Sequence, residues 1–535
     1  MTDSSSKPSA QGEAVESVNS QPYIIAADIG TTSTKTLIIS RAGQVLASHS
    51  IEYPLFTPAA DRAEQDPDQI FEAVVQGIGA VVRKLNLTPE QVLCVSFSSA
   101  MHSLIAVDEQ TKPLTACITW ADNRSASYAE KLKRSGLGQQ IYSRTGTPIH
   151  PMSPLLKLMW FRDNEPELMK ETHKFIGIKE YVFAKLFGRY LIDHSLASAT
   201  GLFNLENLIW DEDALSHAGV RQEQLSELVP TTYRVEGLSS EYAAAMGLAV
   251  DTPFVIGASD GVLANLGVGA FEPGVIAVTI GTSGAVRTVV NKPQTDPEGK
   301  LFCYALTENF WVVGGPINNG GIVFRWVRDQ IATAEAEEAR RQGIDPYDYL
   351  TEIASEVSAG SDGLLFLPLL SGERAPYWNA NARGVYFGLS LSHQKKHMIR
   401  AALEGVMFSI QAVAASLERM MGPASVIRAS GGFARSTFWR QMMTDMLGTS
   451  VTVPDSIESS GIGAALLGLL AMGEIDDLSH AHQWIQVGMA HEVNESDYRI
   501  YQQLTSIYTS VYHQLKDQFD AITAFQGQHL RSPQS

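Results

Sequence analysis

Near its start the sequence has an apolar run that leads directly into a polar turn. Residues 23–27 are all hydrophobic, and Asp28, Gly30 and a run of hydroxyl side chains at positions 31–34 follow them. A short continuous apolar run bounded by turn residues is typical of a buried strand, and Gly30 permits a tight turn after it. We therefore expect a hairpin whose turn offers hydroxyl and N–H donors, with a carboxylate beside them.

The same pattern returns about halfway along the chain. Residues 275–280 form a second run of strand-forming side chains, and Gly281, Thr282, Ser283 and Gly284 follow it. Two hairpins of one kind predict two similar lobes, each of which contributes one turn to a shared cleft.

Alternating strand and helix patterns connect and follow the two hairpins. Strands are expected at residues 44–53, 91–97, 104–108, 116–120, 252–257, 363–370 and 425–429, and helices at 66–86, through most of 125–228, from 322, at 436–447 and at 496–518. The strand at 91–97 ends in a polar tip at residues 98–102, and such tips often carry function. The alternation of the two element types predicts an α/β fold.

These elements divide the chain into two lobes and two tails. The lobe boundary is expected just before residue 258, where the strand at 252–257 leads to Ser259, Asp260 and Gly261. The first lobe then covers residues 22–257 and the second covers 258–518. Residues 1–21 are rich in Ser, Gln and Glu and have no apolar core, which predicts a disordered tail and not a signal peptide. Residues 519–535 form a C-terminal tail.

Composition and charge are those of an ordinary soluble globular protein. Hydrophobic residues make up 44% and charged residues 18%, and the formal net charge is −18, which argues against a general nucleic-acid or membrane-surface role. The three cysteines belong to no CxxC or His-bearing cluster, so neither a disulfide framework nor a zinc site is expected. No apolar run reaches the about 18 residues of a membrane helix, and the predicted location is the cytoplasm.

Two well-known nucleotide motifs do not fit the sequence. The stretch from Gly30 to Lys35 lacks the second glycine that a P-loop requires before its lysine. The glycines at 461 and 463 resemble a dinucleotide fingerprint, but no strand runs directly into them and the third glycine falls at 468. We interpret residues 461–465 as the start of a helix.

Two longer stretches carry a resemblance to a known family. Residues 152–164, and residues 383–389 with their continuation to Gly405, match the two signatures of the FGGY carbohydrate kinases, and the similarity extends from about Tyr23 to Tyr512. Within this family the sequence is most similar to the gluconate kinases. The resemblance implies two actin-like (ribonuclease H-like) α/β ATPase lobes with a catalytic cleft between them. Lys157 and Trp160, inside the first signature, are interpreted as helix packing residues.

The resemblance also implies roles for individual residues. Asp260 is the implied general base, which accepts the proton of the attacking hydroxyl, and Asp28 is the implied ligand of Mg²⁺ through its waters. The implied nucleotide-binding residues are Thr31, Thr32 and Lys35 in the first hairpin, Gly281 and Thr282 in the second, and Gly321, Arg325, Gly432 and Ser436 at two helix starts. The implied sugar-binding residues are Met101, His102, Asp122, Arg124 and Lys179.

The implied reaction is ATP-dependent phosphorylation of a sugar acid, D-gluconate to 6-phosphogluconate. An acid substrate needs a cationic residue that faces away from Asp260, and Arg124, Lys179 and Arg287 stay open as candidates, Arg being the better bidentate partner of a carboxylate. Two alternatives also stay open, a pentulose kinase such as xylulokinase and a non-catalytic sugar-binding member of the family. The expected partners are a sugar or sugar acid and ATP or ADP, and a homodimer stays an open option.

Overall fold

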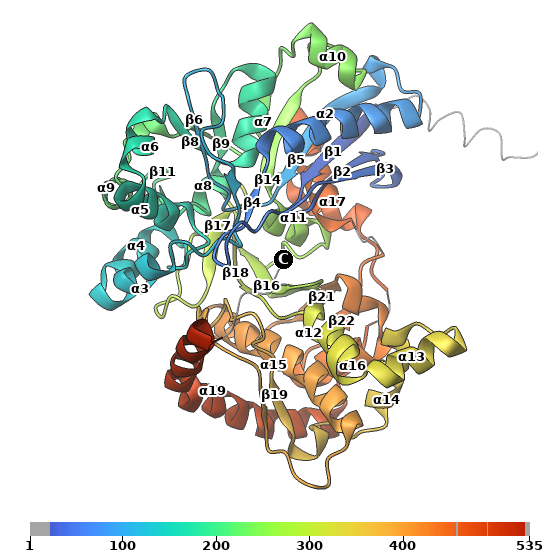
Figure 1. Cartoon of the computed structure of the whole chain (residues 1–535). Coiled ribbons are helices and arrows are strands. Elements are labelled where there is room, and N and C mark those ends of the chain that lie inside the picture. The colour runs from blue at the N-terminus through green and yellow to red at the C-terminus, as the bar shows by residue number, and fades with distance from the viewer. Residues whose placement is uncertain (1–21, 456–457, 489, 530–535) are drawn as a thin grey trace, which may run out of the picture.

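The computed structural model describes residues 22–455, 458–488 and 490–529, which fold into an upper and a lower lobe in Figure 1. Each lobe is built on one six-stranded sheet with helices packed against it. The tail predicted at residues 1–21 lies outside the described residues.

The sheet of the upper lobe is assembled around the first hairpin. Its strand order is β13-β14-β5-β1-β2-β3, with β1 at Tyr23–Ile29, β2 at Ser33–Ile39, β3 at Val45–Glu52, β5 at Val92–Ser99, β13 at Arg234–Val235 and β14 at Phe254–Ser259. Strand β1 pairs antiparallel with β2 and parallel with β5, and β14 pairs parallel with the other side of β5. The carboxyl ends of β1, β5 and β14 therefore meet at one edge of the sheet.

The sheet of the lower lobe repeats this topology around the second hairpin. Its order is β17-β18-β16-β15-β21-β22, with β15 at Val275–Ile280, β16 at Gly284–Val290, β17 at Phe302–Ala305, β18 at Trp311–Ile317, β21 at Val426–Ser430 and β22 at Val451–Thr452. Strand β15 pairs antiparallel with β16 and parallel with β21, as β1 pairs with β2 and β5. The two hairpins thus hold equivalent places in two similar sheets.

Helices cover both faces of the upper sheet. On one face lies α2 (Pro67–Lys84), whose first turn is capped by the Asp66 side chain and has Pro67 at its start. On the other face lie α11 (Asp260–Gly267) and α17 (Ser459–Met472), and Figure 1 shows α17 among the N-terminal strands although it comes late in the chain. A Cβ at Gly267 would lie 1.8 Å from the Ser459 carbonyl oxygen, so this glycine permits the close approach of the two helices.

The position of β14 changes the lobe boundary. The boundary predicted between residues 257 and 258 falls inside this strand, and both β14 and the helix that begins at Asp260 pack with the upper sheet. Asp260 therefore lies with the first lobe in space, whereas the sequence prediction assigned it to the second. The physical reason is that β14 hydrogen-bonds to β5, a pairing across more than a hundred residues that a local pattern does not reveal.

The lower lobe is formed around a long apolar helix. Helix α15 (Lys395–Met421) is the one described helix that is long and apolar enough to cross a membrane, but 83% of its apolar window is buried inside the protein, as in a core helix. Around it lie α12 (Gly321–Trp326), α13 (Thr333–Gln342), α14 (Pro346–Ser355), α16 (Thr437–Leu447) and α19 (Glu495–His529). Helix α19 extends beyond the predicted end at residue 518, so residues 519–529 are helical.

The remaining elements of residues 64–246 combine helices with short strands. They are β4 (Glu64–Gln65), β6 (Ile105–Val107), β7 (Cys117–Ile118), α3 (Ala126–Ser135), α4 (Leu137–Thr145), α5 (Pro154–Asn164), α6 (Pro166–Glu171), β8 (Lys174–Ile176), α7 (Ile178–Phe187), β9 (Leu191–Asp193), α8 (His194–Ser198), β10 (Phe203–Asn204), β11 (Ile209–Trp210), α9 (Glu212–Ala218), β12 (Glu227–Val229) and α10 (Ser240–Met246). Among these strands, β4 pairs with β7, β6 with β8, β10 with β11 and β12 with β9. The short strands β19 (Leu365–Leu367) and β20 (Val385–Phe387) pair in the lower lobe.

Candidate active site

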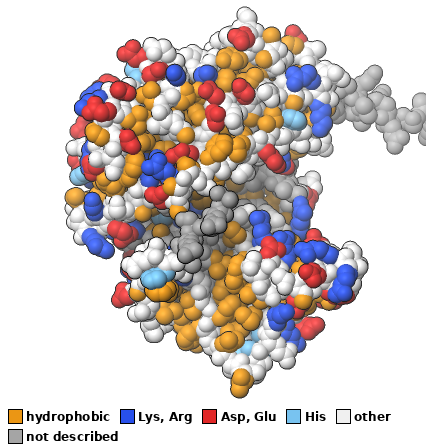
Figure 2. Space-filling model, viewed as in Figure 1, with side chains coloured by type: hydrophobic (Ala, Val, Ile, Leu, Met, Phe, Trp, Pro, Cys, Tyr) orange, Lys and Arg blue, Asp and Glu red, His pale blue; other side chains and the backbone are white. Residues whose placement is uncertain are grey.

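A cavity of about 410 Å³ lies between the two hairpins. In the face shown in Figure 2 the molecule is hollowed between the lobes. Both sheets contribute to the walls, which are lined by Asp28, Thr31, Met101, His102, Trp120, Met152, Asp260, Gly261, Ser460, Thr279, Gly281, Ser283, Arg287, Phe302, Tyr304 and Arg374, among others. Seven of the candidate residues named from the sequence therefore line one space: Asp28, Thr31, Met101, His102, Asp260, Gly281 and Arg287.

Asp260 is the first residue of α11 and follows β14 without a loop. Its Oδ1 accepts a hydrogen bond of 2.6 Å from the backbone N–H of Gly261. Burial and the nearby negative charge of Asp28 raise the pKa of Asp260 to about 7, while Gly261, Arg287 and Lys179 act in the opposite direction. A carboxylate with a pKa near neutrality suits general base catalysis at physiological pH.

Asp28 lies at the end of β1, on the other side of β5 from Asp260. Its Oδ2 accepts a hydrogen bond of 2.6 Å from the Ser460 hydroxyl, whereas its buried Oδ1 has no partner among the described residues. Burial raises the pKa of Asp28. The Ser98 hydroxyl lies near enough to Asp28 to act on its pKa in the opposite direction, but it forms no hydrogen bond with Oδ1. A buried carboxylate oxygen in this state fits a magnesium ion or one of its water ligands, so the residues present agree with the implied metal.

His102 faces the cavity in a fixed orientation. Its backbone is left-handed, with φ at 69°, and its Nδ1 lies 2.7 Å from the Ala199 carbonyl oxygen, to which it donates. Burial, together with the charge of Lys157, lowers the pKa of His102 to about 3. The imidazole is therefore neutral, and Nε2 is left as a hydrogen-bond acceptor for a substrate hydroxyl.

Lys157 holds two loops of the upper lobe together, the loop that contains His102 and the loop that contains Thr119. Its side chain is fully buried, and Nζ donates to the carbonyl oxygens of His102 at 2.6 Å and Thr119 at 2.8 Å. Burial lowers the pKa of Lys157 to about 7. The interpretation of Lys157 as a helix packing residue is thus incomplete, because its ammonium group joins α5 to both loops.

The expected nucleotide residues of the second lobe lie around the second hairpin. The N–H of Gly321 donates to the Gly281 carbonyl at 2.7 Å, so α12 begins directly against the turn. Arg325 is exposed on α12, and Phe324 of that helix contacts Trp439 of α16, with ring centroids 5.7 Å apart. Of the remaining residues, Gly432 is exposed, Ser436 caps α16, and the Thr282 carbonyl accepts a hydrogen bond from the backbone N–H of Ile322 in α12. None of Thr282, Gly321, Arg325, Gly432 and Ser436 is among the residues that line the 410 Å³ cavity, and their contacts with nucleotide stay predictions.

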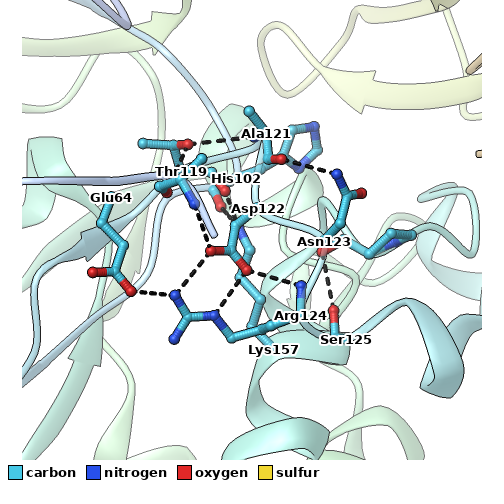
Figure 3. Close-up of polar contacts among 11 residues, drawn as sticks. Glu64, His102, Thr119, Ala121, Asp122, Asn123, Arg124, Ser125 and Lys157 are labelled. Carbon is cyan, nitrogen blue, oxygen red and sulfur yellow. Dashed lines mark hydrogen bonds and ion pairs between the residues drawn. The ribbon is translucent and has the colours of Figure 1, made fainter. Parts of the chain in front are cut away.

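Asp122 and Arg124 form an ion pair with each other, and neither is among the residues that line the cavity. Figure 3 shows the Arg124 guanidinium between the carboxylates of Asp122 and Glu64. The Arg124 Nε lies 2.8 Å from Asp122 Oδ1, and Asp122 is completely buried. Asp122 also accepts a hydrogen bond from the backbone N–H of Ala63. Both residues brace the loop after β7, and their contact with substrate stays a prediction.

Lys179 and Lys35 are likewise held by acidic partners. The Lys179 ammonium lies 2.7 Å from Asp193 and is 1% exposed, behind the end of β14, where it also donates to the Ala258 carbonyl at 3.3 Å. Lys35 pairs with Glu458 at 2.5 Å. Neither lines the cavity, nor does Thr32, whose carbonyl accepts from the N–H of Tyr53. The placement of Lys179 does not support a direct contact with substrate.

Sequence reasoning missed several residues of the cavity. Arg374 enters it from the loop between β19 and β20, Trp120 from the loop after β7, and Ser460 from α17. Trp120 lies at the end of the strand predicted at residues 116–120, and the sequence prediction gives it no role in the site, although its Nε1 donates to Thr31 Oγ1 at 2.9 Å. The sequence around Arg374, a glutamate before it and Ala-Pro after it, contains no motif that predicts a substrate-binding residue.

The arrangement suits transfer of a phosphoryl group to an alcohol. The turn of each hairpin borders the cavity, and the carboxylates of Asp28 and Asp260 both line it, which is the combination that a metal ligand and a general base require. Trp120 from the upper lobe and Phe302 and Tyr304 from β17 of the lower sheet supply an apolar face, and His102 supplies a hydrogen-bond acceptor for a polyhydroxylated chain.

Comparisons with known proteins agree with this geometry. Residues 23–267 match the model of the FGGY family of carbohydrate kinases, N-terminal domain, and residues 276–472 match that of its C-terminal domain. The chain is 53% identical over 506 residues to the gluconokinase of Bacillus subtilis (strain 168), a match that covers 94% of this chain and 98% of the relative.

Two solved structures have closely similar folds. The gluconate kinase from Lactobacillus acidophilus superposes with a TM-score of 0.89 at 37% identity, and the ligand-bound xylulose kinase from the same organism with a TM-score of 0.89 at 36% identity. Each match covers 94% of this chain and 100% of the other. The predicted fold class of two ribonuclease H-like lobes is confirmed.

Proposed function

The chain belongs to the FGGY family of carbohydrate kinases, and we propose that it transfers the γ-phosphate of ATP to the C6 hydroxyl of D-gluconate, forming 6-phosphogluconate and ADP. The observation that carries the reaction type is the joint presence of Asp28 and Asp260 in one cavity closed on its other side by the second hairpin. The choice of gluconate rests on the 53% identity to a gluconokinase over nearly the whole chain.

In the proposed reaction Asp260 accepts the proton of the C6 hydroxyl as that oxygen attacks the γ-phosphorus. The bond between the γ-phosphorus and the oxygen that bridges to the β-phosphorus breaks, and its electron pair leaves with ADP. In phosphoryl transfer, most of the rate enhancement comes from neutralising the phosphate charge and aligning the attacking hydroxyl with the γ-phosphorus. The family's usual Mg²⁺ would be held by Asp28 and would neutralise phosphate charge; Thr31 and Gly281 would face the phosphate chain.

A cytoplasmic location is proposed from the state of the cysteines and from the similarity to bacterial gluconokinases. Cys94, Cys117 and Cys303 are all buried and free of disulfides, which agrees with a reducing interior such as the cytoplasm, where ATP is supplied.

A coupled ADP-release assay tests the proposal. The purified protein is incubated with ATP, Mg²⁺ and, in separate reactions, gluconate, xylulose, ribulose or glycerol, and kcat/KM is compared. Gluconate should be preferred, and Asp260→Asn should lose activity by about 10²- to 10⁴-fold while it keeps its affinity for ATP. A large preference for xylulose would instead make the chain a pentulose kinase of the same mechanism, and binding of sugar and ATP without turnover would make it a non-catalytic member.

A further inference from the structure

The cavity contains two guanidinium groups, each with a carboxylate near enough to act on its pKa: Asp260 acts on Arg287 and Glu373 acts on Arg374. Within the described residues, neither Arg287 nor Arg374 forms an ion pair, although both line the cavity. The pKa of each is lowered to about 10, mainly by burial. The Glu373 carboxylate accepts its hydrogen bonds from amide groups of Asn318, Asn319 and Arg374 and not from a guanidinium. Partly desolvated cations that lack a hydrogen-bonded acidic partner are costly to a folded protein, and an anionic ligand would provide one.

The other cationic residues considered for this role are already paired. Arg124 lies between Asp122 and Glu64, and Lys179 lies against Asp193. His102 is neutral, because burial lowers its pKa to about 3. The choice for an acidic substrate group is therefore between Arg287 and Arg374.

Arg287 belongs to the reacting end of the cavity. A Cβ at Gly261 would lie 3.6 Å from Arg287 Nε, so this guanidinium is next to the start of α11 and hence beside Asp260. Asp260 is also the charged group that acts on the pKa of Arg287. A guanidinium in this place neutralises charge around the base and the transferring phosphoryl group, at the end of the substrate that carries the attacking hydroxyl.

Arg374 lies on the sugar side of the cavity. Its Nε donates to Asn318 Oδ1 at 2.7 Å and its Nη2 to the Ile317 carbonyl at 3.2 Å, which fixes the plane of the group. The guanidinium carbon is 4.9 Å from the ring centroid of Trp120. Among the described residues no hydrogen bond is made by Nη1. Arg374 lines the same cavity as His102 and Tyr304, and its charge contributes to lowering the pKa of His102.

We propose that Arg374 binds the C1 carboxylate of the substrate and so selects a sugar acid over a neutral sugar. The inference rests on the proposed function, because it takes gluconate as the substrate. In gluconate the carboxylate and the phosphorylated hydroxyl are at opposite ends of the carbon chain. With the C6 hydroxyl at Asp260 and Arg287, the carboxylate reaches the second guanidinium, whose orientation is set by Asn318 and Trp120 before substrate arrives.

The test compares gluconate with D-glucitol, which has the same chain but a hydroxymethyl group in place of the carboxylate. For Arg374→Gln we expect kcat/KM for gluconate to fall by about 10²-fold, the loss typical of a charge-assisted contact, with little change for glucitol. Arg374→Lys keeps the positive charge and should recover part of the loss. Arg287→Gln is the matched variant, and it should reduce turnover of both substrates and raise the pKa seen in the pH profile.

A direct binding measurement covers the case in which glucitol is not turned over. Gluconate is titrated by calorimetry into the wild-type protein and into Arg374→Gln, without ATP, and the dissociation constant should be larger for the variant. Thermal unfolding and ADP binding then show whether the variant is folded. Unchanged gluconate binding, equal losses on both substrates, or a loss confined to the KM for ATP would overturn the role of Arg374. Absence of gluconate turnover by the wild-type protein would instead overturn the proposed function.

Discussion

Asp28 and Asp260 approach one cavity from two strands that flank the same central strand, and the charge of Asp28 contributes to raising the pKa of Asp260 to about 7. Burial is the larger cause of this shift. The pairing of two carboxylates explains how one of them can hold a metal while the other acts as a base near neutral pH.

The first prediction concerns the pH dependence of activity. Asp260 must be deprotonated to accept the hydroxyl proton, so kcat/KM for gluconate should rise with pH and level off above an inflection near 7. The measurement is a set of initial rates at low gluconate from pH 5.5 to 9 at constant ionic strength. A flat profile over this range would exclude titration of Asp260 as the controlling step.

The second prediction concerns stability. The Asp260 carboxyl has an ordinary pKa of 3.8 but a pKa of about 7 in the folded protein, so between these values the folded state holds the extra proton. The contribution of this site to stability therefore falls as the pH rises from about 4 to about 7. Asp260→Asn should raise the melting temperature by a few degrees at pH 8 and by less at pH 5.

The matched control for this measurement is Asp251→Asn, at an exposed aspartate. Its melting temperature should follow that of the wild-type protein at both pH values. If Asp260→Asn is less stable than wild type at pH 8, the ionised Asp260 carboxylate does not destabilise the folded state, and the prediction is wrong.

The third prediction concerns the metal. Asp28→Asn removes the negative charge at the unpartnered Oδ1, so the Mg²⁺ concentration that gives half-maximal rate should rise by about 10-fold or more. Ser460→Ala removes only the hydrogen bond to Oδ2 and should change this concentration much less. Titration of Mg²⁺ at saturating ATP and gluconate gives both values, and equal requirements in all three proteins would exclude Asp28 as the metal-holding residue.

The fourth prediction concerns Lys157. Replacing it by methionine keeps the packing volume but leaves the carbonyls of His102 and Thr119 without their donor, which should cost about 1–3 kcal/mol of stability for an unsatisfied buried group. The KM for gluconate should rise because His102 loses its orientation, while the KM for ATP changes little. The exposed Lys170→Met variant is the control. A lower melting temperature with an unchanged KM for gluconate would make Lys157 a purely structural residue.

Much of the fold could be predicted from the sequence, because strands, helices and tight turns are set by local order of side chains. The run at residues 23–27 and the turn at Gly30 appear as β1 and its hairpin, the second hairpin appears as β15 and β16, and the helix predicted at residues 66–86 appears as α2. Asp260, placed after an apolar strand and before a glycine, was also identified from local sequence together with the family resemblance.

The tertiary structure alone decided which charged groups are available for substrate. Asp193 neutralises Lys179, Glu64 and Asp122 neutralise Arg124, and no described carboxylate pairs with Arg374. It also decided that β14 and Asp260 belong with the upper sheet. The physical reason is that hydrophobic periodicity and turn formation act between near neighbours in the chain, whereas ion pairing and burial depend on residues that meet only when the sheets and helices have packed.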